Sequence, residues 1–268
     1  MAKIKLIATD IDGTILKRNF EFNQEVKDCI SKLTNEGIKV VLVTGRMYEA
    51  AGYIAQDLGL ETPVVCYQGG LVRHNNKTLY EKNLCPNYAK EIMFWAKENN
   101  VHLNLYMNDR LYVERDDETV KRYTGERATG YKVKSFNELT LEKINKLLLI
   151  DFNDTERVSC WENYLTEKYE NLHIVKSMPY FCEVCHQEAT KMSAVNFLKK
   201  HWNIKTEEVL TIGDQNNDIS LLQAGGIKVA MGNATDELKA VADYITDTVN
   251  DNGFVKAVER FVYNEAKL

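Results

Sequence analysis

The feature that most limits the possible folds is a short apolar run that ends abruptly in two acids. Residues 4–8 read Ile-Lys-Leu-Ile-Ala, and the chain then reaches Asp10 and Asp12, followed by Gly13 and Thr14. A run with so little polar alternation predicts a strand that is buried on both faces, as strands of a parallel sheet are. Acids two residues apart at its end project to the same side. The sequence therefore predicts two like charges at one edge of a buried sheet.

Strand-like and helix-like segments alternate through the first and last thirds of the chain. The expected strands are residues 4–9, 38–43, 63–67, 209–212 and 227–230. The expected helices are residues 23–37 (with Asn23 as N-cap), 47–58, 191–201, 219–224 and 235–242. Such alternation is typical of an α/β fold, a doubly wound parallel sheet with helices on both faces.

The middle of the chain follows a different pattern, in which paired strands mix with helices. The expected strands there are residues 102–106, 111–114, 146–151, 172–176 and 180–186, and the expected helices are residues 87–99 and 156–169. Hairpin strands mixed with helices predict an α+β unit. We therefore expect a core domain of residues 1–83 and 184–268, with an inserted domain of residues 84–183.

The charge balance excludes several classes of partner. The 268 residues include 34 basic and 39 acidic side chains, so the net charge of -5 predicts no basic face for nucleic acid or for an anionic membrane. No apolar run approaches the ~18 residues of a membrane span, and the N-terminal residues lack a secretory signal pattern. We therefore expect a cytoplasmic protein whose six cysteines are free thiols, including Cys182 and Cys185, which face opposite sides of a strand.

Asp10 and Asp12 are expected at the carboxyl edge of the sheet, where open α/β sheets bind ligands. Two carboxylates this close repel each other unless a cation or a proton lies between them. Two arrangements satisfy this condition: Mg²⁺ held by oxygen ligands, or one ionised acid beside one protonated acid. A nucleophile beside a general acid fits both. Loop acids that cap a turn or a helix are the structural alternative.

Three further polar segments are expected at the same edge. They are Thr44, Gly45 and Arg46 after residues 38–43, Lys191 after residues 180–186, and Asp214, Asn216, Asn217 and Asp218 after residues 209–212. A hydroxyl, an unhindered amide and a helix start can bind an anion, and the acids can complete an oxygen site with Asp10. Each segment alone can equally be a helix cap or a surface feature. Their convergence at one edge is what favours function.

The segments DIDGT, TGR, Lys191 and GDQNND resemble, in order and spacing, motifs one to four of the haloacid dehalogenase superfamily. The pairing of the first motif with the last is highly specific, and the resemblance spans essentially the whole chain. Residues 84–183 resemble the cap of the Cof-type (class IIB) sugar-phosphate phosphatases. The resemblance implies a haloacid dehalogenase-like core with an inserted α+β cap. It also implies a Mg²⁺-dependent phosphatase of small metabolites such as sugar, nucleotide, flavin or pyridoxal phosphates.

The family's pattern implies a role for each matching residue. Asp10 would be the nucleophile that forms an aspartyl-phosphate, and Asp12 would act first as general acid and then as general base. Mg²⁺ would be held by the Asp10 carboxylate, the Asp12 backbone carbonyl and Asp214, with Asp218 assisting. The groups that would bind the phosphoryl oxygens are Thr44, Gly45, Lys191 and Asn217.

The sequence departs from the family's pattern at two positions. Gln68 stands where an asparagine usually precedes a glycine after the third strand, and Met192 stands where a glycine often follows the lysine, whereas Arg46 agrees with the pattern. Neither departure involves the nucleophile, the acid or the metal ligands, so we expect activity to survive. The cap residues that could contact a leaving group are His102, Asn104, Tyr106, Arg115, Tyr123, Arg127, Tyr180 and Glu183.

Two other functions remain open at this point. A phosphomutase or phosphotransferase would pass the phosphoryl group from the same intermediate to a sugar, and a catalytically silent protein would only bind phosphometabolites. A nucleotide kinase is disfavoured because the chain contains no G-x-x-x-x-G-K-[ST] loop. The expected partner is a small phosphorylated metabolite, with no nucleic acid and no membrane, and the expected assembly is a monomer or a weak homo-oligomer.

Overall fold

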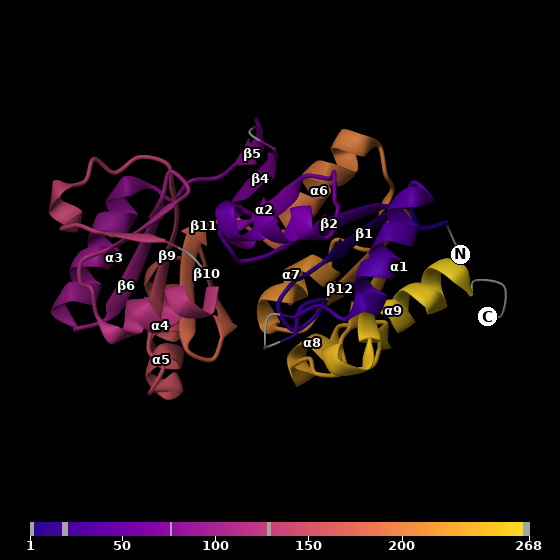
Figure 1. Cartoon of the computed structure of the whole chain (residues 1–268). Coiled ribbons are helices and arrows are strands. Elements are labelled where there is room, and N and C mark those ends of the chain that lie inside the picture. Colours follow the sequence, from indigo (N-terminus) through magenta and orange to yellow (C-terminus); the bar gives the residue numbers. More distant parts are fainter. Residues whose placement is uncertain (1–2, 18–20, 76, 128–129, 265–268) are drawn as a thin grey trace.

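Segments from both ends of the chain share one parallel sheet. The computed structural model describes residues 3–17, 21–75, 77–127 and 130–264, which form two lobes (Figure 1). The five strands of the first lobe's sheet, in spatial order, are β14 (Tyr244–Ile245), β13 (Ile227–Ala230), β12 (Val209–Gly213), β1 (Leu6–Thr9) and β2 (Lys39–Leu42). Ile7 of β1 lies opposite Leu210 on one side and Val40 on the other. The predicted parallel sheet is confirmed.

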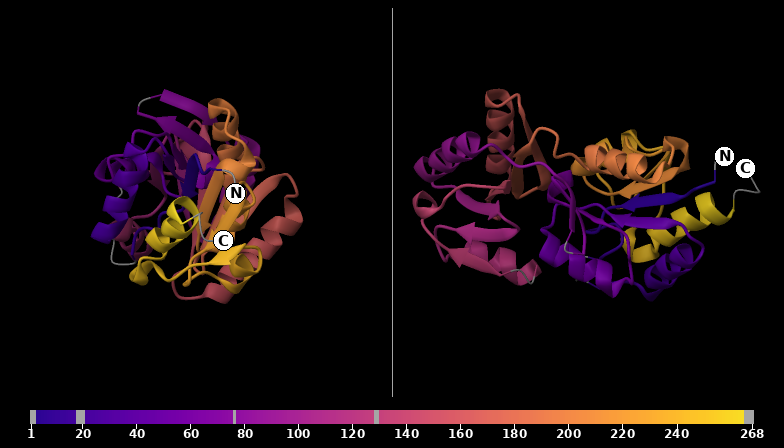
Figure 2. Two further views of the ribbon diagram at one scale, coloured as in Figure 1. Left: turned by 90° about the vertical axis from the view of Figure 1, so that its right-hand side faces the viewer. Right: turned by 90° about the horizontal axis from the view of Figure 1, so that it is seen from above.

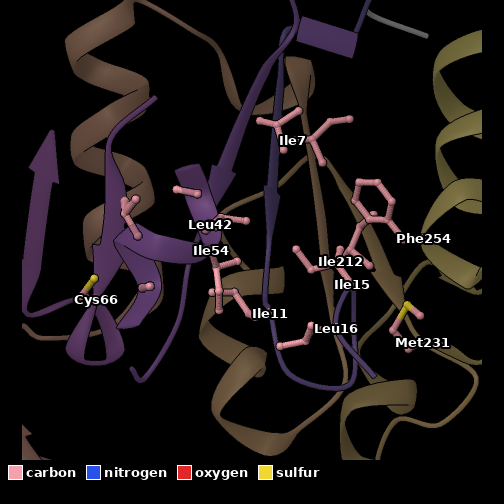
Figure 3. Packing of buried hydrophobic residues seen from close by; sticks show 14 of the residues in the cluster. Ile7, Ile11, Ile15, Leu16, Leu42, Ile54, Cys66, Ile212, Met231 and Phe254 are labelled. Carbon is pink, nitrogen blue, oxygen red and sulfur yellow. The ribbon is translucent and has the colours of Figure 1, made fainter. Parts of the chain in front are cut away.

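Helices cover both faces of this sheet, because successive residues of a buried strand point to opposite sides. Ile7 packs in a cluster with Ile30 and Phe254 (Figure 3), whereas Ala8 packs in another cluster with Leu198. The surrounding helices are α1 (Gln24–Asn35), α2 (Tyr48–Asp57), α6 (Lys191–Trp202), α7 (Ile219–Leu222), α8 (Asp236–Ala240) and α9 (Gly253–Val258). The predicted doubly wound α/β class is therefore confirmed.

The third predicted strand lies at the border of the sheet. β3 (Val64–Cys66) meets the parallel sheet through a single bridge between Val43 and Val65. It pairs in antiparallel fashion with β4 (Leu71–His74), which in turn pairs with β5 (Lys77–Glu81). This hairpin is absent from the predicted elements because β4 ends in two polar residues and β5 has no buried residue. Its sequence pattern is therefore weak.

The second lobe, which lies beside the first in the right-hand view of Figure 2, is built on a sheet of six strands in the order β10-β11-β9-β6-β7-β8. The strands are β6 (His102–Met107), β7 (Arg110–Val113), β8 (Tyr131–Val133), β9 (Ile144–Ile150), β10 (Leu172–Met178) and β11 (Phe181–His186), and the helices are α3 (Pro86–Glu98), α4 (Glu118–Arg127) and α5 (Thr155–Lys168). β8 was not predicted, and it pairs in parallel with β7. The expected boundary between residues 183 and 184 falls inside β11, so the division into domains stays a prediction.

The two faces of the six-stranded sheet have different neighbours. One face packs against α3 and α5, in a cluster that includes Leu105 and Trp161. The opposite face carries Tyr106 and Phe181, which join the cluster that extends into the first lobe. Side chains on this second face can therefore reach the edge of the parallel sheet. We call the second lobe the cap.

Smaller predictions on helix capping and on the thiols had mixed outcomes. Asn23 is the N-cap of α1, but its side chain makes no capping bond and instead donates to Val249 O at 3.4 Å. All six cysteines lie within the described residues and are free. Cys182 and Cys185 are buried in β11, and burial raises the pKa of both thiols. In the described parts of the chain, no helix is long and apolar enough to cross a membrane.

Candidate active site

Polar side chains from four segments meet at the carboxyl edge of the parallel sheet. Asp10 follows β1, Thr44 lies just beyond β2, Asp214 follows β12, and Lys191 is the first residue of α6. The pairing of β1 with β12 sets two of these strand ends side by side, because Asp10 N donates to Ile212 O at 3.0 Å. The convergence that the sequence predicts therefore follows from the strand order.

Lys191 lies fully buried between two carboxylates. Its Nζ donates to Asp10 Oδ1 at 2.6 Å and to Asp218 Oδ1 at 2.5 Å. Burial alone would lower the pKa of this lysine, but the two carboxylates outweigh burial and raise the pKa of Lys191 above its ordinary value. The ammonium therefore keeps its charge and separates two acids that would otherwise repel each other.

Three acids around this ammonium form a buried cluster. Asp10, Asp214 and Asp218 each offer a carboxylate oxygen, and these oxygens lie within 4.8 Å of one another. Burial, reinforced by the neighbouring carboxylates, raises the pKa of Asp10 well above its ordinary value and the pKa of Asp214 to about 7. One ammonium cannot balance three carboxylates, and a set of buried oxygen donors is what a hard divalent cation prefers. The residues present therefore fit Mg²⁺.

Gly13 allows the first motif to approach this cluster. It has φ +82°, in the left-handed region, and a Cβ at this position would lie 2.3 Å from Asp214 Oδ2. Thr14 Oγ1 donates to Asp214 Oδ1 at 3.4 Å. The glycine and threonine of DIDGT therefore bring the loop after β1 against the loop after β12.

Asp218 serves both structural and electrostatic purposes. Its Oδ2 accepts hydrogen bonds from Asp214 N at 3.0 Å and from Gln215 N at 3.2 Å, while Oδ1 accepts from Lys191. The alternative interpretation of this acid as a helix cap is correct in part, because Asp218 takes part in a capping box with Gln215 at residues 216–218 but makes no side-chain capping bond to α7. With so many bonds already accepted, an assisting place in a metal site suits this carboxylate better than a leading one.

The Asp12 carboxylate points to a different partner. Arg46 Nε donates to Asp12 Oδ2 at 2.7 Å and Arg46 Nη2 donates to Asp12 Oδ1 at 2.5 Å, a bidentate pair. The Asp12 side chain is 42% exposed, whereas that of Asp10 is 9% exposed. Burial would lower the pKa of Arg46, but the hydrogen bond and charge of Asp12 raise it. The two acids of the first motif therefore have separate surroundings, as different roles require.

The predicted phosphate-binding groups lie where the cap meets the first lobe. Thr44 is buried, and its Oγ1 accepts from Arg46 N at 3.1 Å. The carbonyl of Gly45 accepts from Lys146 Nζ of the cap at 2.7 Å. Asn217 is also buried, and its Nδ2 donates to Gln68 Oε1 at 3.1 Å. Gly45 therefore contacts the cap directly, whereas Thr44 and Asn217 bond to Arg46 and Gln68 of the first lobe.

The sequence assigns three of these residues no role in the site. Arg46 is expected at the sheet edge without a partner, Gln68 is only a departure from the family pattern, and Lys146 is not a candidate. Lys146 is the single charged side chain within the buried strand β9, and that isolation was the available signal. A charged residue in such a strand needs a partner, and the partners of Lys146 lie on other elements.

The cap residues that could contact a leaving group have different surroundings in the structure. His102, Asn104 and Arg115 bond to residues of the cap, since His102 Nδ1 contacts Asp117, His102 Nε2 contacts Asn104 and Arg115 Nη1 donates to Asn100. Tyr106, Tyr123 and Glu183 lie buried, and the hydroxyls of the two tyrosines contact each other. Tyr180 packs edge-on against Phe181. Arg127 ends α4, and its side chain is outside the described part of the structure.

A family model and several phosphatases match this chain over most of its length. Residues 7–258 match the model of the haloacid dehalogenase-like hydrolases. A phosphatase of Bacillus subtilis, named YwpJ, is 30% identical over 278 residues, covering 93% of this chain and 97% of the relative. The 5-amino-6-(5-phospho-D-ribitylamino)uracil phosphatase YitU of Bacillus subtilis is 26% identical, covering 96% of this chain and 97% of the relative. The matches therefore extend over both lobes.

Solved structures share the same fold. A haloacid dehalogenase-like hydrolase from Bacteroides thetaiotaomicron superposes with a TM-score of 0.85 at 26% identity, covering 96% of this chain and 99% of that one. A sugar phosphatase of subclass IIB superposes with a TM-score of 0.85 at 23% identity, covering 96% of this chain and 98% of that one. The cap is therefore part of the shared architecture.

Proposed function

The chain belongs to the haloacid dehalogenase-like hydrolase family, and its relatives mark it as a phosphatase; from this premise we propose that it hydrolyses small phosphorylated metabolites with Mg²⁺, through an aspartyl-phosphate on Asp10. The observation that carries the proposal is the buried Asp10 carboxylate at the sheet edge, 2.6 Å from the Lys191 ammonium and within an acidic cluster. A carboxylate in such a place can attack phosphorus when positive charge offsets the repulsion between them.

The proposed reaction has two displacements on phosphorus. In the first, an oxygen of Asp10 forms a bond to phosphorus while the bond to the leaving alkoxide breaks, and Asp12 gives that alkoxide a proton. In the second, Asp12 removes a proton from water, whose oxygen attacks phosphorus and releases inorganic phosphate and the Asp10 carboxylate. The bidentate contact with Arg46 fixes the position of the Asp12 carboxylate, and this contact must open for Asp12 to carry a proton, because both of its oxygens accept from Arg46.

The residues around Asp10 would neutralise and orient the transferring group. Mg²⁺ would be held by the Asp10 and Asp214 carboxylates and the Asp12 backbone carbonyl, with Asp218 assisting, and would supply positive charge beside the phosphoryl oxygens. The proposed phosphoryl-binding groups are Thr44, the Gly45 amide, Lys191 and Asn217. The close approach of Lys191 to both Asp10 and Asp218 supports its place in this set.

The names of two similar proteins support a ranking of the proposed substrate classes. One relative is named for a ribitylamino-uracil phosphate, and one structural neighbour is titled a sugar phosphatase. Both names describe a phosphate ester of a chain or ring that carries hydroxyl groups. We therefore place sugar and polyol phosphates ahead of nucleotide, flavin and pyridoxal phosphates. A cytoplasmic location and a monomeric or weakly oligomeric state complete the proposal.

Release of inorganic phosphate from a panel of these esters, with Mg²⁺ or with a chelator, tests the proposal. We expect Mg²⁺-dependent release, with sugar or polyol phosphates at the top of the ranking. Mass spectrometry of the sugar product distinguishes hydrolysis from phosphoryl transfer between sugar positions. Isomer formation without phosphate release would identify a mutase, and no reaction with any ester would contradict the proposed function.

Replacing Asp12 by asparagine tests the separation of roles within the first motif. We expect turnover to fall by about 10²–10⁴-fold, the usual contribution of a positioned acid or base. Mg²⁺ binding should persist, because the variant retains the Asp12 backbone carbonyl and the carboxylates of Asp10 and Asp214. Calorimetric titration with Mg²⁺ measures this directly. A variant that no longer binds Mg²⁺ would contradict the role assigned to the Asp12 side chain.

A further inference from the structure

Gln68 lies in an unusual stretch of backbone at the junction of the lobes. Gln68 has φ 58° and Tyr67 before it has φ 52°, both in the left-handed region that side chains with a Cβ seldom adopt. Gln68 is fully buried. Such conformations persist where surrounding contacts impose them, and they cluster at functional sites. The contacts of these two residues are therefore informative.

Both strained residues are bonded to the cap. Tyr67 Oη donates to Asp109 Oδ1 at 2.6 Å, and Gln68 Nε2 donates to Glu183 Oε1 at 2.9 Å. Asp109 lies in the turn between β6 and β7, and Glu183 lies in β11, so both acceptors belong to the cap. Two carboxylates of the cap therefore accept hydrogen bonds from the strained turn of the first lobe.

The Gln68 amide also bonds to a residue of the first lobe. Its Oε1 accepts from Nδ2 of Asn217, one of the proposed phosphoryl-binding groups, at 3.1 Å. Gln68 therefore spans the distance between a carboxylate of the cap and an amide of the phosphate site. Space around it is tight, because a Cβ on Gly45 would lie 2.4 Å from Gln68 Nε2 and 3.2 Å from Glu183 Oε1.

An ion pair of the cap determines which atoms donate and which accept in this chain of hydrogen bonds. Lys146 Nζ contacts Glu183 Oε2 at 2.6 Å, and both side chains are 3% exposed. Burial would raise the pKa of Glu183, but Lys146 and the bonds from Ser177 and Gln68 outweigh it and lower that pKa. An ionised carboxylate only accepts hydrogen bonds, so the amide nitrogen of Gln68 must face Glu183.

The same logic extends to Asn217. Because the Gln68 amide nitrogen faces Glu183, its amide oxygen faces Asn217. Asn217 must therefore donate a hydrogen bond through its own amide nitrogen. Among the described residues, Asn217 Oδ1 has no hydrogen-bond partner. The orientation of the Asn217 amide therefore comes from Gln68. In the opposite orientation two amide oxygens would face each other.

The cap lysine reaches the phosphate loop by a second route. Lys146 Nζ donates to Gly45 O at 2.7 Å, and the N–H of the same peptide group, Arg46 N, donates to Thr44 Oγ1 at 3.1 Å. One buried ion pair of the cap thus contacts the backbone of the second motif directly and Asn217 through Gln68. Both routes end on groups that the proposed function gives to the phosphoryl oxygens.

We propose that Gln68 is a positioning residue that couples docking of the cap to phosphate binding, because it carries the orientation set by Lys146 and Glu183 to Asn217. The inference rests on the proposed function for the role of Asn217. It gives a purpose to the departure from the family's usual asparagine, since the longer side chain spans from Asn217 to Glu183. The Lys146–Glu183 ion pair would then favour phosphate binding without contacting the phosphate itself.

A double-mutant cycle tests the coupling. One variant is Gln68→Met, which keeps the length of the side chain and removes its amide. The other is Lys146→Met with Glu183→Met, which removes the ion pair and the acceptor for Gln68 Nε2 without leaving a lone buried charge. Gln24→Met is the matched control, because Gln24 Nε2 donates to Asp28 Oδ1 at 2.9 Å on an exposed face of α1. Thermal unfolding confirms that each variant is folded.

Two quantities are measured with Mg²⁺ present: the Kd of inorganic phosphate by calorimetry, and kcat and KM for the best ester of the panel. We expect Gln68→Met and the cap variant each to weaken phosphate binding and lower kcat/KM by about tenfold to a hundredfold, the range for hydrogen bonds to charged groups. Combining them should add little further loss, because both break one relay. The control should match wild type.

The outcomes separate this inference from the proposed function. Additive losses, or a cap variant that binds phosphate as wild type does, would overturn the coupling even if wild type hydrolyses the ester. A wild type that releases no phosphate from any ester, while the phosphate Kd values follow the cycle, would overturn the proposed function and leave the coupling in place. Loss in the Gln68→Met variant alone would reduce Gln68 to a local packing role.

Discussion

Replacement of Asp10 by asparagine is expected to lower phosphate release by a factor on the order of 10⁴ or more, while the chain stays folded. The amide is a far weaker nucleophile than the carboxylate, and the proposed cation loses a ligand. The fold should tolerate the change because asparagine keeps an oxygen that can accept from Lys191 Nζ, and Lys191 stays paired with Asp218. Phosphate release from the same ester by wild type and variant measures the effect.

An exposed acid provides the matched control for this experiment. Asp28→Asn on α1 removes the same charge from a side chain that bonds only to the exposed Gln24 among the described hydrogen bonds, and it should retain wild-type turnover. Thermal unfolding of all three proteins separates loss of chemistry from loss of structure. Substantial turnover by a folded Asp10→Asn variant would remove Asp10 from the role of nucleophile.

The parallel-sheet lobe was largely predictable because its strands are short, apolar and almost uniformly buried. β1, β2, β12 and β13 agree with the expected segments to within two residues at each end. Their carboxyl ends must share one edge, so the positions of Asp10, Thr44 and Asp214 in the sequence already implied their meeting in space. In the structure, carboxylate oxygens of Asp10, Asp214 and Asp218 lie within 4.8 Å of one another.

Contacts between the lobes could not be predicted in the same way. The bonds from Gln68 to Glu183 and from Lys146 to Gly45 join residues separated by 115 and 101 positions, on elements with no shared sheet. Hydrophobic periodicity reports which face of a strand is buried but not which lobe covers it. A lone lysine in the apolar strand β9 indicated a buried charge, yet only the docking of the cap identifies its partners.

Replacement of Lys191 by methionine is expected to affect both stability and activity. Lys191 has no exposed surface and lies 2.6 Å from Asp10 Oδ1 and 2.5 Å from Asp218 Oδ1. Methionine fills a similar volume but leaves two buried carboxylates without their cation. We expect the free energy of unfolding in the absence of Mg²⁺ to fall by about 3–5 kcal/mol, the usual cost of removing one partner of a buried ion pair. Phosphate release should fall with it. Urea unfolding measures the first effect.

A second substitution shows whether charge or packing causes the loss of stability. If the uncompensated carboxylates are responsible, then Asp218→Asn in the Lys191→Met background should recover part of the lost stability, since it removes one of the two charges and keeps an oxygen to accept from Asp214 N and Gln215 N. Activity should not return, because the proposed phosphoryl site still lacks its ammonium. Lys200→Met, at an exposed position of the same helix, should change stability by less than about 0.5 kcal/mol. A double variant no more stable than Lys191→Met alone would mean that methionine packs poorly there, and that the buried lysine is not the charge on which this group of acids depends.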